Sequence, residues 1–236
     1  MDILMKTGLY ETIMYFMIYA FIGWFIESTF KSLLYQKPIN SGFLNGPFIP
    51  IYAVGGLFII TFLQRFQGET LKLFFIGFVF MTLIEYITGA LMEKIFNTSW
   101  WDYTGNLLNI GGKICLENSI YWGLLTAFFV NFMHPKIVGL VDKIPHNIGE
   151  GVILIFIVYF IIDYTITLME VLNIQEKVKE FILIRDNPII LATTNRVGEL
   201  KREILKKSKR LIRTYPKLTY LRFNKKLKDI LNEIKK

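Results

Sequence analysis

The sequence predicts an all-α membrane protein, a polytopic bundle of about five transmembrane helices followed by a helical basic tail. Hydrophobic residues make up 53% of the 236 residues and charged residues 19%, whereas an average soluble domain has about 45–50% and about 25%. Five stretches approach the roughly 20 apolar residues that cross a bilayer as a helix. Basic residues gather after the last stretch, which is typical of a segment on the cytoplasmic side.

The five apolar stretches define a transmembrane domain over residues 1–173. They cover residues 10–34, 48–63, 73–96, 118–133 and 151–172. Glu11 precedes the first stretch and no small-residue cleavage site follows it, so we expect this helix to be retained rather than removed as a signal peptide. The lone cysteine, Cys115, excludes an internal disulfide.

The second predicted domain, residues 174–236, is a basic amphipathic helical tail. It holds 18 Lys or Arg and 7 Asp or Glu, so the formal charge of +8 of the whole chain originates here. Asn187-Pro188 predicts a helix break, and two apolar stripes at helical spacing follow, one beginning at Leu200 and one at Leu218. Such helices either dock on a membrane surface or a partner, or pack together as a hairpin.

Three acidic residues lie inside predicted spans, namely Glu27, Glu85 and Asp163. A charge at mid-bilayer costs about 2.5–3.5 kcal/mol on insertion scales, so each acid needs a partner or water. Glycines four and eight residues from Glu85 predict a closely packed neighbour on the helix face that also carries Glu93. The acids either line one polar site for a substrate, ion or proton, or each fastens its helix to a neighbour.

The loops between the spans contribute further candidates. Residues 38–50 contain three Pro, two Gly and no charge after Pro38, which favours a re-entrant or cavity-capping segment over a rigid surface turn. Residues 97–103 combine two Trp with Tyr, which indicates either an anchor at the membrane interface or the walls of a site mouth that contains Asp102. Glu117 begins the fourth span, where an acid suits a helix N-terminus.

These patterns nominate ten residues for a substrate-binding site or ion pathway. They are Glu27, Asn45, Tyr52, Glu85, Glu93, Trp101, Asp102, Tyr103, Glu117 and Asp163. We assign no catalytic residue and expect no metal or cofactor, because the sequence shows no hydrolase or metal-binding spacing. Gly112-Lys113 fails as a phosphate loop, since Leu107 stands where Gly is required and Ile114 where Ser or Thr is required.

Ordered motifs run through the first half of the chain. They are Phe21-Ile22-Gly23-Trp24 with Glu27, Gly42-Phe43-Leu44 with Gly46-Pro47, Pro50-Ile51-Tyr52, Glu85 with Gly89, Trp100-Trp101-Asp102-Tyr103, Ile114-Cys115-Leu116 and His134-Pro135. Over about residues 15–135 the chain resembles the bacterial putative ABC-transporter type IV family, also called CmpB-like permeases. Part of this region is similar to the vertebrate transmembrane protein 229 type. The resemblance implies a permease subunit in the bacterial plasma membrane, and it stops short of Asp163.

Three functions remain open. A transport subunit would use the acids as a path, with energy from a separate ATPase subunit docked on the tail or from protons. An intramembrane enzyme acting on lipid would use the acids and Asn45 to bind a metal ion or as general acid and base. A scaffold or assembly protein would act through its tail. We expect the lipid bilayer as a partner, an ATPase or a second copy of the chain as protein partners, and no nucleic acid.

Overall fold

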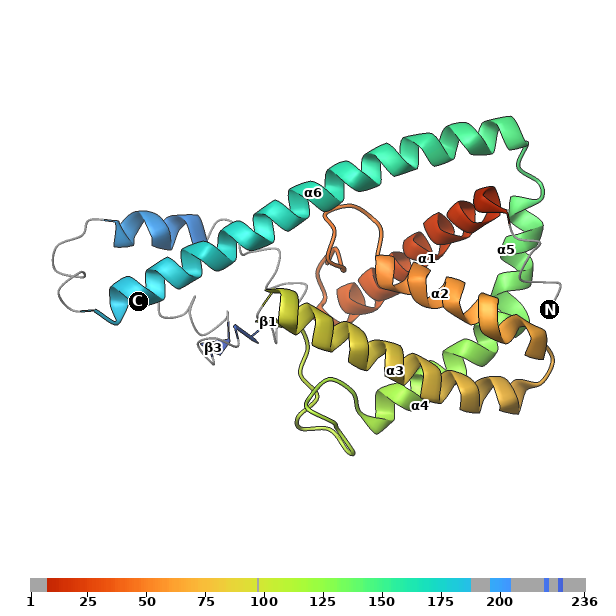
Figure 1. The fold of residues 1–236 in the computed structure, drawn as a ribbon, viewed down its shortest axis with the longest axis horizontal. Coiled ribbons are helices and arrows are strands. Elements are labelled where there is room, and N and C mark those ends of the chain that lie inside the picture. Colours follow the sequence, from red (N-terminus) through yellow and green to blue (C-terminus); the bar gives the residue numbers. More distant parts are fainter. Residues whose placement is uncertain (1–7, 97, 188–195, 205–218, 221–224, 227–236) are drawn as a thin grey trace. The chain divides into compact units, whose positions relative to one another are not determined.

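The computed structural model describes residues 8–96, 98–187, 196–204, 219–220 and 225–226, and these residues are mostly helical, with very little strand (Figure 1). The chain divides into two compact units. The first comprises Met1–Thr88 with Tyr103–Asp163, and the second comprises Gly89–Asp102 with Tyr164–Lys236. Two helices, α3 and α6, contribute residues to both units. The prediction of an all-α membrane helix bundle is confirmed.

All five predicted apolar helices form. The elements are α1 (Leu9–Tyr35), α2 (Pro50–Leu63) with the 3-10 turn η1 (Gln64–Phe66), α3 (Thr70–Phe96), α4 (Leu116–Phe128) with the π-helical turn η2 (Phe129–Met133), α5 (His134–Val141) and α6 (His146–Arg185). Among the described residues, four helices are long and apolar enough to cross a membrane: Leu9–Tyr35, Thr70–Phe96, Leu116–Val141 and His146–Ile184.

The second predicted span is shorter than the other four. α2 has 14 residues, which rise about 21 Å against a hydrocarbon core of about 30 Å. Pro50 begins it at a position where the missing N–H costs nothing. After η1 the chain turns at Gly68, whose φ of +91° suits glycine. After α1, the loop and α2 therefore carry the chain back in the opposite direction.

Local signals explain the ends of α1. Glu11 lies in its first turn, where an acid complements the helix dipole. At the other end Gln36 adopts a left-handed conformation with φ of 51°, and its N–H together with that of Lys37 caps the carbonyls of Leu33 and Ser32. Pro38 follows and prevents the helix from continuing.

The helices of the first unit pack through glycines and aromatic rings. Gly23 and Gly56 face Tyr52 and Tyr19, and any side chain at these glycines would overlap the tyrosine rings, so α1 and α2 pack closely and antiparallel. The Tyr10 and His146 rings, at the starts of α1 and α6, lie 4.2 Å apart. α1 and α6 therefore begin at the same end of the unit and run in the same direction, as spans one and five of the predicted bundle would.

The second unit is built on the C-terminal part of α6. Val178 and Phe181 are buried there together with Leu200 and Ile204 from a helical segment over residues 197–204. Ion pairs join the two segments, Lys177 to Glu203 and Arg196 to Glu180. The described start of the first apolar stripe of the tail, Leu200 and Ile204, therefore packs against the C-terminal part of α6.

The second unit shows where α6 ends and which elements follow it. α6 continues through residue 173, the predicted domain boundary, and ends just before Asn187. Where a second amphipathic helix was predicted from Leu218, the described residues are the strands β2 (Thr219–Tyr220) and β3 (Lys225–Lys226). β2 pairs antiparallel with β1 (Thr98–Ser99). β1 follows the end of α3, so its backbone N–H and C=O groups no longer have helical partners and bond to β2 instead. The rest of that stripe lies outside the described residues.

Candidate functional site

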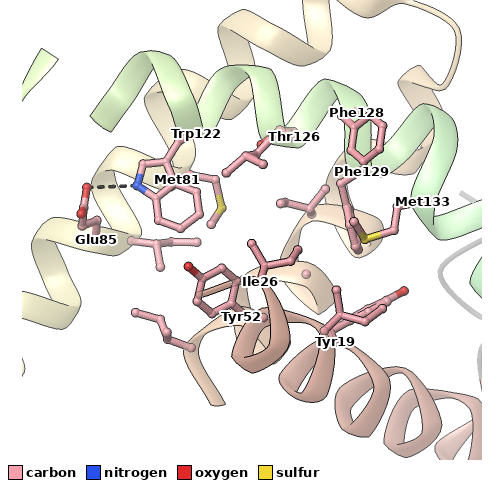
Figure 2. A pocket seen from close by; sticks show the side chains of 18 residues that line it. Tyr19, Ile26, Tyr52, Met81, Glu85, Trp122, Thr126, Phe128, Phe129 and Met133 are labelled. Carbon is pink, nitrogen blue, oxygen red and sulfur yellow. Dashed lines mark hydrogen bonds between the residues drawn. The ribbon is translucent and has the colours of Figure 1, made fainter. Parts of the chain in front are cut away.

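A cavity of about 140 Å³ lies in the first unit, between α1 and α2 on one side and α3 and α4 with η2 on the other. Figure 2 shows Tyr52 and Ile26 facing Trp122 and Thr126 across it. Gly23 on α1 and Gly55 and Gly56 on α2 are among the residues that line it. Among the described residues that line it, Glu85 on α3 is the one with a charged side chain.

Glu85 sits at one end of this cavity and is only 7% exposed. Its Oε2 accepts a hydrogen bond of 3.0 Å from Trp122 Nε1, and its Oε1 accepts 3.3 Å bonds from Asn118 Nδ2 and from the Tyr103 hydroxyl. The three donors are neutral and come from α4 and from the loop before it. Both carboxylate oxygens are therefore satisfied by groups that tolerate a negative charge.

Tyr52 links Glu85 to a second acid. Its hydroxyl lies near the carboxylates of Glu27 on α1 and Glu85 on α3 and near the Tyr103 phenol. Glu27 in turn pairs with Lys31 one helical turn later, with Nζ and Oε1 2.6 Å apart. Because Gly23 has no side chain, the Tyr52 ring fits against α1. Two of the predicted intramembrane acids thus converge on one tyrosine.

The loop that carries Tyr103 is held by its own backbone. The Tyr103 N–H donates to the Gly112 carbonyl at 2.9 Å, and the Asn106 N–H donates to the Tyr103 carbonyl at 2.8 Å. Gly111 and Gly112 have φ of 58° and 67°, which glycine adopts without strain. Burial, and after it the Glu85 carboxylate, raises the pKa of the Tyr103 phenol, so Tyr103 stays a hydrogen-bond donor.

Asp163 is held in a different place. Its carboxylate accepts hydrogen bonds from the backbone N–H of Asn45 at 3.1 Å and of Gly46 at 2.8 Å. Ser41 and Leu44 in the same loop are fully buried. The uncharged loop after α1 is therefore packed against the middle of α6, and Asp163 does not line the cavity.

The remaining predicted residues lie away from the cavity lining. Glu117, exposed at the start of α4, accepts hydrogen bonds from Tyr121 at 3.2 Å and Asn106 at 3.5 Å. Glu93, Trp101 and Asp102 belong to the second unit. Of the ten predicted residues, the structure brings Glu27, Tyr52, Glu85 and Tyr103 together.

The sequence reasoning missed the α4 side of the site. Asn118, Trp122 and Thr126 recur every four residues and so share one helix face. This spacing, with a Trp between two polar residues in an apolar helix, is the signal that would have found them. Thr126 is fully buried, lines the cavity, and its hydroxyl has no hydrogen-bond partner among the described residues.

A buried Tyr–His pair lies beyond the other end of the cavity. The Tyr19 hydroxyl and His134 Nδ1 are 2.7 Å apart, and both side chains are at most 3% exposed. η2 precedes His134 directly, and Phe129 and Met133 of this turn line the cavity with Tyr19. In the part of the chain that the structure describes, no group of three or more His, Cys, Asp or Glu could hold a metal ion.

Comparison with known proteins adds one match. The model of the family described as putative ABC-transporter type IV matches residues 14–168. The match extends past residue 135 and includes Asp163 with most of the transmembrane region, a longer stretch than the motifs of the first half alone. No curated protein and no solved structure matches the chain.

Proposed function

Because the chain belongs to the putative ABC-transporter type IV family, we propose that it is a membrane transport subunit whose substrate contacts the cavity around Glu85. One observation carries the proposal: a buried carboxylate stands at the end of an otherwise uncharged cavity between membrane-spanning helices. An ionisable group in such a place is costly and marks substrate or ion pathways in membrane proteins. Tyr52, Tyr103 and Trp122 hold this end of the cavity in shape.

The orientation of the chain in the membrane and the energy source for transport form part of the same proposal. The excess of Lys and Arg after residue 173 supports a tail on the cytoplasmic side of a bacterial plasma membrane. A separate ATPase subunit would dock there, because the chain itself has no phosphate-binding loop. The second unit, with its buried Leu200 and Ile204, would present the docking surface as one packed piece.

The test compares Glu85→Gln with Glu69→Gln in cells. Glu69 precedes α3, is exposed, and receives the same substitution outside the cavity. Mass spectrometry of cells and medium measures how metabolites partition in strains with the wild-type chain, with either variant, or with no chain. We expect Glu85→Gln to match the strain without the chain and Glu69→Gln to match wild type, at equal membrane levels. Partition unchanged by Glu85→Gln would overturn the proposal.

A lipid-modifying enzyme is the second candidate. Ile26 and Phe128 line the cavity although about half of each side chain is exposed, so this side of the cavity meets lipid when the helices span a membrane. A change in the lipid composition of membranes, abolished by Glu85→Gln while the metabolite partition stays constant, would favour this candidate.

A further inference from the structure

We propose that the cavity around Glu85 binds a small organic cation, an ammonium group on an aromatic or branched aliphatic body. As a statement about the transported substrate, this rests on the proposed function. As a statement about binding it stands on the charge, the walls and the size of the cavity.

The charge of the site comes first. Trp122 Nε1 and Asn118 Nδ2 can only donate, and they bond different oxygens of Glu85, so both oxygens act as acceptors. Among the described residues no Lys, Arg or His pairs with Glu85, and Lys31 pairs with Glu27 instead. When Glu85 is ionised, it is a buried anion without a counter-charge, which is costly in a medium of low dielectric constant. A cationic guest supplies the missing charge.

The walls beside Glu85 are aromatic. The Tyr52 and Trp122 rings lie 6.4 Å apart at an angle of 51°, and both line the cavity next to Glu85. Aromatic faces attract ammonium groups, most strongly where water is excluded. An anionic guest would face both the Glu85 carboxylate and the electron-rich ring faces. The site therefore selects for positive charge by attraction and against negative charge by repulsion.

The rest of the cavity fits a compact apolar body. Its volume of about 140 Å³ is close to that of an engineered apolar cavity of about 150 Å³ that takes up benzene. Ile26, Met81 and Phe129 offer apolar contact there. The volume and the apolar walls therefore suit a compact apolar group.

Titration calorimetry with three guests of one shape tests the charge. The full chain in nanodiscs of zwitterionic lipid receives benzylammonium, neutral benzyl alcohol or anionic benzoate at pH 7, with empty nanodiscs as blanks. We expect benzylammonium to bind at least about tenfold more tightly than benzyl alcohol and benzoate to bind most weakly. Benzyl alcohol or benzoate binding as tightly as benzylammonium would overturn the proposal. This comparison needs no variant.

The variants locate the preference. Glu85→Gln should bring the ratio of the benzylammonium and benzyl alcohol affinities to about one and leave benzyl alcohol binding within about twofold, because the amide keeps the shape and removes the charge. Glu69→Gln should leave every affinity unchanged. A preference that survives in folded Glu85→Gln contradicts the proposal, and so does palmitate binding more tightly than benzylammonium, which would identify the guest as a lipid.

The two proposals fail separately. A preference for benzylammonium that depends on Glu85, with no effect of Glu85→Gln on metabolite partition in cells, supports the cation site and refutes transport. A preference for a neutral or anionic guest, with partition that depends on Glu85, refutes the cation site and leaves transport standing.

Discussion

The carboxylate of Asp163, in the middle of α6, accepts a 2.8 Å hydrogen bond from the backbone nitrogen of Gly46, which lies 117 residues earlier in the chain. With the neighbouring bond from Asn45, this contact fastens the loop between α1 and α2 to α6. Gly46 is placed so close that a side chain there would overlap the Tyr159 hydroxyl. An acid inside a membrane helix thus acts here on backbone N–H groups, whereas Glu85 faces a cavity.

Asp163→Ala should lower the free energy of unfolding by about 3 kcal/mol, because two backbone N–H groups lose a charged acceptor. Asp163→Asn should cost less, since its amide oxygen still accepts one bond. Thermal unfolding in detergent measures both, with the exposed Asp142→Asn as the control. Wild-type stability of Asp163→Ala would show that the contact contributes nothing.

Gly46→Ala should destabilise the first unit, because its methyl group would meet Tyr159 and the Asp163 carboxylate. The matched change Gly139→Ala, in α5 with nothing within 4 Å of the added carbon, should stabilise the protein by about 0.5–1 kcal/mol through helix propensity. Melting temperatures of the two variants should therefore shift in opposite directions. Tyr159→Phe should restore part of the loss in the double variant, and equal shifts of the two single variants would refute the clash.

Tyr19→Phe should cost about 1–2 kcal/mol, because it leaves His134 Nδ1 buried without its partner. Tyr15→Phe serves as the control. Its ring stacks on Tyr19 with centroids 5.9 Å apart, and the structure records no hydrogen bond from its hydroxyl to the described residues. Chemical denaturation of the purified protein measures the difference, and equal stability of the two variants would argue against a role for the Tyr19–His134 bond.

The raised pKa of the Tyr103 phenol predicts that the free energy of unfolding depends on pH in the alkaline range. Its pKa is raised above the ordinary value of 10 in the folded chain, so the folded state holds this proton more tightly than the unfolded state. The stability linked to it is complete below pH 10 and is lost as the pH rises toward the folded pKa. Relative to Tyr103→Phe, the wild type should lose stability above about pH 10. Parallel pH profiles of the two proteins would contradict this.

The membrane class and most of the helices could be read from the sequence. Hydropathy and length depend on composition over about 20 residues, so each long span is a local property. The cost of burying Glu27, Glu85 and Asp163 can also be read from the sequence. It predicts that each acid has a partner, but it does not identify the partner. α2 covers nearly the predicted residues 48–63, beginning at Pro50. The strand at Thr219–Tyr220 differs from the predicted helix, because that segment pairs with β1.

By itself the sequence determined that this is a membrane helix bundle with three acids among its apolar helices. Only the tertiary structure decided which groups Glu85 and Asp163 contact. Glu85 meets Trp122 and Asn118 because α3 and α4 pack together, and Asp163 meets the backbone of Asn45 and Gly46. A backbone N–H has no side-chain identity to read in a sequence, and contacts between segments far apart in the chain arise from packing rather than from helical spacing.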